Sequence, residues 1–206
     1  PFGGMVKALE HHSDSPESYF VHTPGLKVII PSRPYDAKGL IVSAIRDNDP
    51  VIFFEPKRVY RAIKEEVPEQ EYVIPIGKAS LRREGEQVTV ISWGAMVREC
   101  EKALDQMKIS ADLIDLRTVS PLDTKSIIQS VGKTGRAVIV QEAQRTLGLA
   151  SEIIALINDH SLLSLEAPVE RITGFDTIVP LAKLEDYYSP SVERIIYGIK
   201  KVVEYR

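Results

Sequence analysis

The sequence has little cysteine, few aromatic residues and no excess of charge of either sign. Cys100 is the only cysteine of the 206 residues, which excludes an internal disulfide and a zinc site built from several cysteines. The formal net charge is −3 at pH 7, with Lys and Arg scattered among acids, so the basic surface typical of nucleic-acid binding is lacking. No apolar run approaches the ~18 residues of a membrane span. We therefore expect neither nucleic acid nor membrane as a partner.

The chain also lacks an initiator methionine and a targeting segment at its start. It opens at Pro1-Phe2-Gly3-Gly4, and the glycines before Met5 are typical of a loop already under way, so we expect residues upstream of Pro1 to be missing. The lone cysteine fits a reducing interior. We expect a cytoplasmic protein of a prokaryote, with the mitochondrial matrix as the alternative.

What the sequence does contain is a regular alternation of apolar strands and amphipathic helices. Strands are expected at 27–30, 51–54, 88–92, 112–116, 137–141 and 169–173. Helices are expected at 34–47, with Ile45 on the apolar face, after Trp93, after Asp123, from about Leu149, and from Ser189-Pro190 onward. This alternation predicts an α/β fold with a doubly wound, mostly parallel sheet.

Residues 67–86 differ from both flanks, because prolines and glycines interrupt them and charges dominate both ends. We interpret them as a linker with a short strand at 72–76. The chain then divides into residues 1–66, the linker 67–86, and residues 87–206.

Two adjacent histidines, His11 and His12, precede a helix-start pattern. Ser15 is a candidate N-cap, Pro16 suits the first helical position, and Glu17 places a negative charge in the first turn. His12 would then lie on a loop with its side chain facing outward. Histidine exchanges protons near neutral pH, whereas a merely solvated or structural pair is the plainer interpretation.

A second candidate site lies at the expected helix end from Ala44 to Asp49. Carbonyl oxygens at a helix C-terminus carry partial negative charge, and Asp47 and Asp49 add carboxylates, which together suit a hard cation. The alternative is that these acids only solvate a turn before Pro50.

Other side chains have two interpretations each. Glu142 follows an expected strand end, where open α/β sheets hold ligands, but a solvated loop acid has the same pattern. Cys100 is most simply a core residue. Lys57 and Arg58 are interpreted as surface charges or as contacts with a partner subunit. Tyr187 and Tyr188 could lie at an interface or pack against the last helix.

Six motifs follow one another over most of the chain. They are His12-Ser13-Asp14-Ser15-Pro16-Glu17, His22-Thr23-Pro24-Gly25-Leu26-Lys27-Val28, Pro34-Tyr35-Asp36-Ala37-Lys38-Gly39-Leu40, Ala44-Ile45-Arg46-Asp47-Asn48-Asp49-Pro50, Phe53-Phe54-Glu55-Pro56-Lys57 and Asp115-Leu116-Arg117-Thr118-Val119-Ser120-Pro121-Leu122-Asp123. Gln141-Glu142-Ala143 and Lys183-Leu184-Glu185-Asp186-Tyr187-Tyr188 continue the pattern. In this order, the motifs resemble the β subunit of the thiamine-diphosphate-dependent 2-oxoacid dehydrogenase E1 component, of the pyruvate or branched-chain type.

The resemblance implies a fold and a reaction. The chain would hold the end of a thiamine pyrimidine-binding domain followed by a transketolase-type C-terminal domain. Thiamine diphosphate with Mg²⁺ would be shared with an α subunit in a heterotetramer containing a second β subunit. The reaction would be oxidative decarboxylation of a 2-oxo acid, with transfer of the acyl group to the lipoyl group of the E2 acyltransferase. Residues that bind the cofactor are expected upstream of Pro1.

The resemblance also implies roles for single residues. His12 matches the histidine that such subunits place at the active-site mouth, where it assists transfer to the lipoyl arm, and His11 would flank the site. Asp14 stands where many relatives carry Gln, and a contact with His12 would favour the protonated imidazole. The 44–49 segment matches a structural potassium site, whose ligands would be the carbonyls of Ala44 and Ile45 together with Asp47 and Asp49.

Two other functions stay open at this point. The chain could be a non-catalytic module that dimerises and docks the acyltransferase core, or part of another thiamine enzyme such as a transketolase or a deoxyxylulose-phosphate synthase. Both pyruvate and branched-chain substrates also stay open, and the run from Phe53 to Lys57 favours the branched-chain or broad-specificity type.

Overall fold

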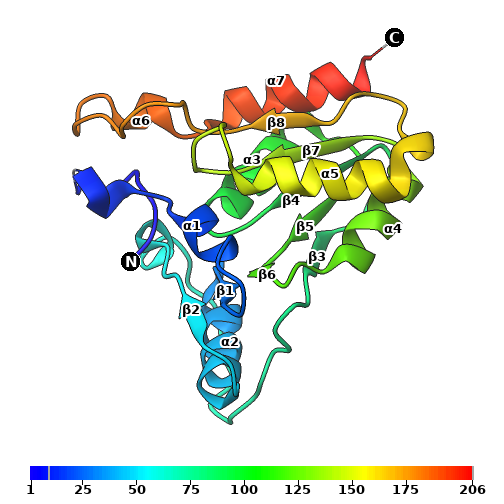
Figure 1. The fold of residues 1–206 in the computed structure, drawn as a ribbon. Coiled ribbons are helices and arrows are strands. Elements are labelled where there is room, and N and C mark those ends of the chain that lie inside the picture. Colours follow the sequence, from blue (N-terminus) through cyan, green and yellow to red (C-terminus); the bar gives the residue numbers. More distant parts are fainter. Residues whose placement is uncertain (9, 206) are drawn as a thin grey trace.

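The computed structural model describes residues 1–8 and 10–205, which form two sheets with helices packed around them (Figure 1). The strands are β1 (Lys27–Ile29), β2 (Val51–Phe53), β3 (Ser80–Arg83), β4 (Val88–Ser92), β5 (Ala111–Asp115), β6 (Thr118–Ser120), β7 (Ala137–Val140) and β8 (Glu170–Ile172). The helices are α1 (Glu17–Val21), α2 (Pro34–Arg46), α3 (Met96–Met107), α4 (Thr124–Thr134), α5 (Leu149–Ser161), α6 (Glu185–Tyr188) and α7 (Val192–Val203). Short 3₁₀ turns are η1 (Glu10–Ser13), η2 (Lys57–Val59) and η3 (Leu162–Ser164).

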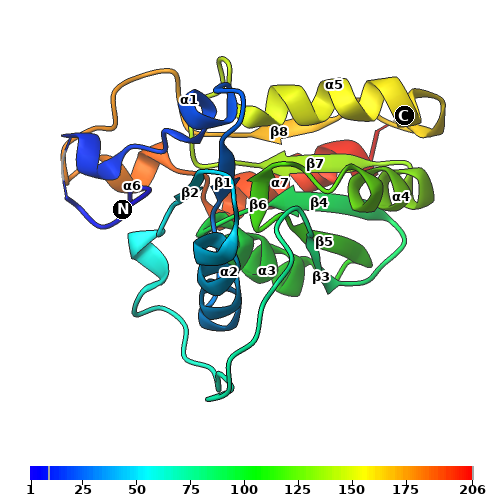
Figure 2. The same cartoon turned by 60° about the horizontal axis from the view of Figure 1, so that its bottom comes forward.

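The larger sheet has the strand order β3-β5-β4-β7-β8. Its last four strands are parallel, and β3 pairs antiparallel with β5 at the edge. Helices α3 and α7 cover one face, and α4 and α5 cover the other (Figure 2). Strand side chains alternate between faces, so Val90 packs toward α3 and α7 while Ile91 packs toward α4 and α5. This arrangement confirms the predicted α/β fold with a doubly wound, mostly parallel sheet.

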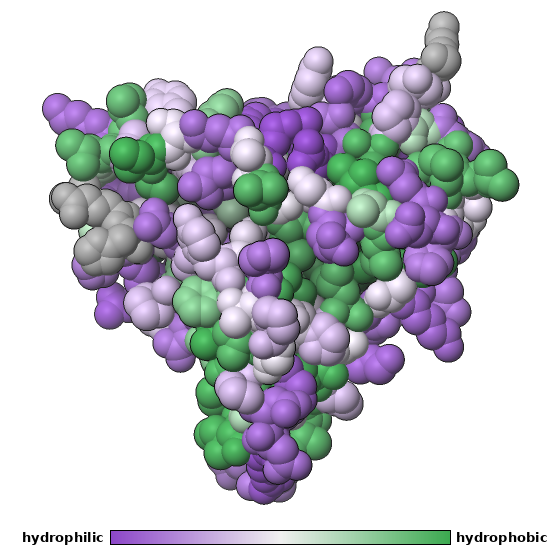
Figure 3. All heavy atoms as spheres, in the orientation of Figure 1, coloured by the Kyte–Doolittle hydropathy of each residue, from purple (hydrophilic) through white to green (hydrophobic). Residues whose placement is uncertain are grey.

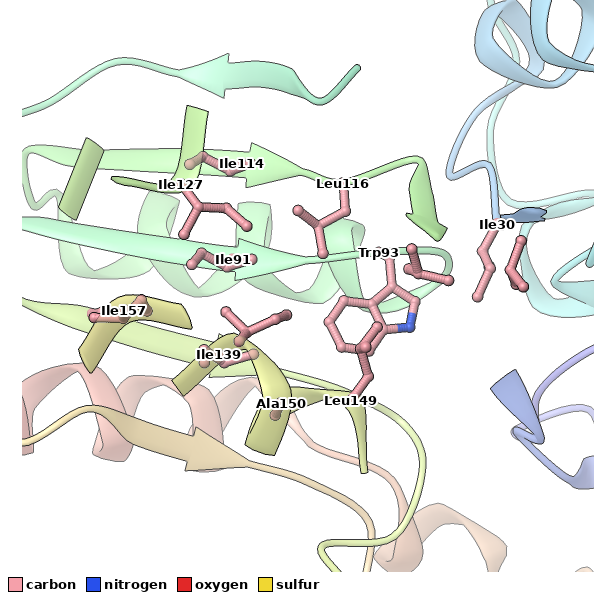
Figure 4. Close-up of a cluster of buried hydrophobic side chains, with 14 of the residues drawn as sticks. Ile30, Ile91, Trp93, Ile114, Leu116, Ile127, Ile139, Leu149, Ala150 and Ile157 are labelled. Carbon is pink, nitrogen blue, oxygen red and sulfur yellow. The ribbon is translucent and has the colours of Figure 1, made fainter. Parts of the chain in front are cut away.

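The smaller sheet has the order β2-β1-β6. It connects the smaller half of the molecule, which contains β1, β2, α1 and α2, with the larger half, which contains the larger sheet and its helices. Strand β1 pairs parallel with β2 and antiparallel with β6, which follows β5 after a turn at Leu116 and Arg117. One apolar core runs across this joint, and Figure 4 shows Trp93 of the larger half beside Leu149, with Ile30 of the smaller half nearby. The sequence did not predict β6, because Thr118-Val119-Ser120 contains one apolar residue and lacks the apolar run that indicated β1 and β2.

The segment assigned to the linker folds differently from the prediction. Residues 72–76 form no strand; they run over α2, where the amide of Ile74 donates to the carbonyl of Gly39 at 3.2 Å. A Cβ at Gly39 would lie 2.7 Å from the Ile74 side chain, so this close approach requires glycine. The strand in this region is β3 instead, at the edge of the larger sheet.

Helices α2 and α5 begin at Pro34 and Leu149, as predicted, whereas α1 and α7 begin later than predicted. Pro16 occupies the N-cap position of α1, without a side-chain cap, so Ser15 is not the cap. Helix α7 begins after Ser191, whose hydroxyl accepts from the amide of Arg194 at 3.3 Å, and Ser189 therefore precedes it. On α2, Ile45 is 77% exposed and lies outside the packed face. Among residues 1–8 and 10–205, the helices are too short or too polar to cross a membrane.

Candidate functional site

His12 lies on the 3₁₀ turn η1, between the first residues of the chain and α1. Its side chain faces outward, as predicted, although the turn replaces the predicted loop. Its carbonyl accepts from the ammonium of Lys57 at 2.5 Å, so Lys57 holds the backbone of this turn. The side chain of His11 lies outside the described residues, and a contact between Asp14 and His12 stays a prediction.

Glu17, the first residue of α1, is buried against the only tryptophan of the chain. The indole of Trp93 donates to Oε1 of Glu17 at 3.3 Å, and Oε2 has no hydrogen-bond partner among the described residues. Burial raises the pKa of Glu17 to about 8. The prediction that Glu17 carries a negative charge at the helix start is therefore wrong at neutral pH, because the cost of burying the carboxylate outweighs the hydrogen bonds that favour it.

Glu142 and Glu185 approach the first residues of the chain from the larger half. Glu142 follows β7 and accepts from the amide of Gly4 at 2.6 Å, and Glu185 of α6 accepts from the amide of Met5 at 2.5 Å. Both side chains are buried, and burial raises the pKa of Glu142. Glu142 is thus no solvated loop acid. Sequence reasoning missed this pair of contacts because each joins residues far apart in the chain.

At the end of α2, Asp47 and Asp49 lie around a cation supplied by the chain, the ammonium of Lys27. The ammonium of Lys27 lies 2.7 and 2.8 Å from the two carboxylate oxygens of Asp47 and 3.0 Å from Asp49. Lys27 holds the pKa of Asp47 below its usual value. The carbonyl of Ala44 accepts from the amide of Asp47 at 3.4 Å. Both carboxylates are thus paired with Lys27, and a bound cation would have to share them with its ammonium.

Potassium at this helix end therefore stays a prediction. In the described part of the chain, no group of three or more His, Cys, Asp and Glu side chains is arranged to hold a metal. The predicted site would depend on main-chain carbonyls, those of Ala44 and Ile45, as much as on its two carboxylates.

The remaining candidates have structural surroundings. Arg58 pairs with Glu99 at 3.0 Å, and Cys100 is buried in the core as predicted. Tyr188 is buried with its ring edge-on to Phe175, 6.5 Å between centroids, whereas Tyr187 is exposed. Figure 3 shows apolar side chains at the surface around α6, where Ile178, Leu181 and Leu184 are also exposed.

A buried polar network at the joint of the two sheets was not predicted. Arg117 lies 3.0 Å from Asp36 at the start of α2, with both side chains mostly buried. The same guanidinium donates to the carbonyls of Lys78 and Ala79. Nearby, the hydroxyl of Ser32 donates to Asp115, whose pKa burial raises to about 7. This network ties α2 to the larger sheet.

The fold defines a class of protein, and comparison with known families agrees with it. Residues 77–195 match the family described as transketolase, C-terminal domain, and residues 1–63 match transketolase, pyrimidine binding domain. The chain therefore belongs to the transketolase C-terminal domain family. A solved structure described as a split gene transketolase, inactive β4 tetramer, shares the fold, with a TM-score of 0.75 and 20% identity over 91% of this chain and 60% of that chain.

Its curated relatives are more specific. The chain is 51% identical over 208 residues to the pyruvate dehydrogenase E1 component subunit beta of Bacillus subtilis (strain 168) and 50% identical over 209 residues to that of Acholeplasma laidlawii. The subunit of Staphylococcus aureus (strain Mu50 / ATCC 700699) is 48% identical over 208 residues. The chain is thus a homologue of pyruvate dehydrogenase E1 β subunits, and it spans 64% of the length of these relatives.

Proposed function

We propose that this chain acts within the β subunit of a pyruvate dehydrogenase E1 component, which decarboxylates pyruvate and passes the acyl group to the lipoyl group of E2. The observation that carries the proposal is 48–51% identity, over the whole of this chain, to curated subunits with that name. These relatives favour pyruvate over the branched-chain substrate suggested by the run from Phe53 to Lys57.

His12 is the proposed catalytic residue. When bound, thiamine diphosphate with Mg²⁺ would supply the decarboxylation chemistry. The part of His12 is to hold or move a proton while the acyl group passes to the lipoyl arm, and its outward-facing position on η1 supports access for such an arm. The interactions of the nearby described acids are with the protein itself: Glu142 and Glu185 accept from backbone amides, and Oε1 of Glu17 accepts from the Trp93 indole. No contact with the cofactor is therefore assigned to them.

The wider organisation is proposed on the same basis. Residues 1–66 would be the end of the pyrimidine-binding domain, 67–86 the linker and 87–206 the C-terminal domain. The partners would be an E1 α subunit, a second β subunit and E2, and the potassium ion would lie at the end of α2. The bacterial sources of the relatives support a cytoplasmic location.

The test pairs His12 with a matched histidine. His12→Ala and His22→Ala, both at exposed positions, would be made in a full-length β subunit that contains this chain and assembled with an α subunit. We expect both variants to assemble, and only His12→Ala to lose acyl transfer to the lipoyl domain. Unchanged transfer in His12→Ala would contradict the catalytic role. A wild-type assembly that decarboxylates no 2-oxo acid would favour the non-catalytic docking module.

A further inference from the structure

The segment that leads toward His12 has an unusual backbone. Gly3, Met5 and Lys7 all have positive φ angles, of 81°, 63° and 57°. Only glycine adopts this region without strain, so Met5 and Lys7 keep it only where surrounding contacts determine the backbone. We therefore looked for the groups that hold this segment.

Two buried carboxylates from the other half of the molecule make those contacts. Glu142 is 3% exposed and Glu185 1% exposed, and they accept from the consecutive amides of Gly4 and Met5 at 2.6 and 2.5 Å. A Cβ at Gly3 would lie 2.9 Å from Oε2 of Glu142, and a Cβ at Gly4 would lie 3.0 Å from Oε1 of Glu185. The backbone thus lies directly against both carboxylates. Figures 1 and 2 show α6 beside the first residues of the chain.

The same segment is joined to the turn that carries His12. The amide of Gly3 donates to the carbonyl of Asp14 at 2.9 Å, which closes the loop 3–14 at its base. Lys57 fixes this loop on its other side, because its amide donates to the carbonyl of Phe2 at 3.2 Å and its ammonium donates to the carbonyl of His12 at 2.5 Å. A movement of Gly3 and Gly4 would therefore be transmitted to η1.

We propose that Glu142 and Glu185 form a carboxylate clamp that fixes the base of the loop 3–14 and thereby sets the position of His12. The two acids are positioning residues, since they act through the backbone of Gly4 and Met5. The clamp adds a positioning role to the proposed function. Only its expected effect on acyl transfer depends on that proposed function. Glutamate is suited to this task, because its side-chain oxygens accept hydrogen bonds from backbone amides and its length lets them reach the backbone of Gly4 and Met5.

Amide hydrogen exchange of the 206-residue chain tests the clamp without any activity. Glu142→Ala and Glu185→Ala remove the acceptor oxygens. Glu142→Gln and Glu185→Gln keep an acceptor oxygen on a side chain of the same length. Glu152→Ala, at an exposed acid on α5, is the matched control. We expect each alanine variant to speed exchange at Gly4 and Met5 by several-fold to roughly tenfold, as for the loss of one buried hydrogen bond. The glutamine variants should recover part of the protection.

The location of the change decides the outcome. Faster exchange confined to residues 3–8 and 12–14, with β4 unchanged, supports the clamp. Unchanged exchange at Gly4 and Met5 overturns it, and so does an equal increase in β4, which would make the acids general stability residues. If an alanine variant does not fold, its glutamine partner and the second acid provide the same comparison.

The assembled enzyme provides a second, separate readout. Glu142→Ala should lower kcat for acyl transfer about tenfold or more while KM for pyruvate stays near the wild-type value, because the clamp positions His12 and does not bind substrate. Glu142→Gln should restore much of kcat. An inactive wild-type assembly would refute the proposed function and leave the exchange result to judge the clamp, whereas unchanged kcat in an active assembly would refute the positioning of His12.

Discussion

Replacing Glu17 by Gln should stabilise the protein increasingly as the pH rises above 4.5, and should remove one step of its pH dependence. The carboxyl group is fully buried, and its pKa is raised from 4.5 to about 8. Between these values the folded chain binds a proton at Glu17 that the unfolded chain has released. The stability of the wild type therefore falls as the pH rises from 4.5 to 8, and it falls no further from this cause at higher pH.

The size of the effect follows from the same pKa values. Each pKa unit corresponds to about 1.4 kcal/mol, so ionisation of Glu17 removes at most about 5 kcal/mol of stability across the window. Glutamine keeps an acceptor for the Trp93 indole and cannot ionise, so Glu17→Gln avoids this loss. We expect the variant to match the wild type near pH 4.5 and to exceed it increasingly up to pH 8, in urea unfolding at each pH.

Trp93 provides a direct assay, because it is the only tryptophan of the chain and its indole donates to Glu17. The fluorescence of the folded wild type should change with a midpoint near pH 8, and Glu17→Gln should lose that change. Glu152→Gln, at an exposed acid, should keep it. A wild type without the transition, or the same transition in Glu17→Gln, would refute the reasoning that burial controls this carboxyl.

Three further predictions concern the helix ends and the joint. Removing potassium should lower the melting temperature of the wild type but not of Asp47→Ala, and an equal response in both proteins would reject the metal site. Arg117→Met leaves Asp36 buried without its cation and should cost about 3–5 kcal/mol in urea unfolding, with a smaller cost once Asp36→Asn is added. Asp123→Ala should cost about 1–2 kcal/mol, because the Asp123 side chain caps α4 by accepting from Ser126 at 3.2 Å. Although burial opposes it, hydrogen bonds from Ala79 and Ser126 hold the pKa of Asp123 below its usual value, so this difference should shrink as the pH falls through that pKa.

The larger sheet could be predicted because its central strands are covered on both faces. Burial on two sides favours uninterrupted apolar runs, such as Ala137–Val140, which are easy to recognise. Strand β3 could not be predicted in the same way, since an edge strand with the sequence Ser-Leu-Arg-Arg has no such run. Ile45 misled the prediction of the α2 face, because periodicity alone does not show which residues meet another element.

In the candidate site, too, the features that belong to local motifs could be predicted and the contacts between distant residues could not. His12 and the 44–49 segment belong to local motifs, so the sequence could single them out. The contacts of Glu142 and Glu185 with the first residues depend on how the two halves meet, which no local pattern contains. The burial of Glu17 depends on Trp93, 76 positions away, and was missed for the same reason.

The carboxylate clamp also has a consequence for the order in which the chain folds. Its two hydrogen bonds join residues that are 138 and 180 positions apart in the sequence. Strand β1 likewise pairs with β6 only after that later strand has been synthesised. During synthesis the His12 segment leaves the ribosome before Glu142, and Glu185 follows later still. Before both acids have emerged, hydrogen bonds with Asp14 and Lys57 can hold this segment, but the clamp cannot. The clamp is therefore completed only after α6 has been made.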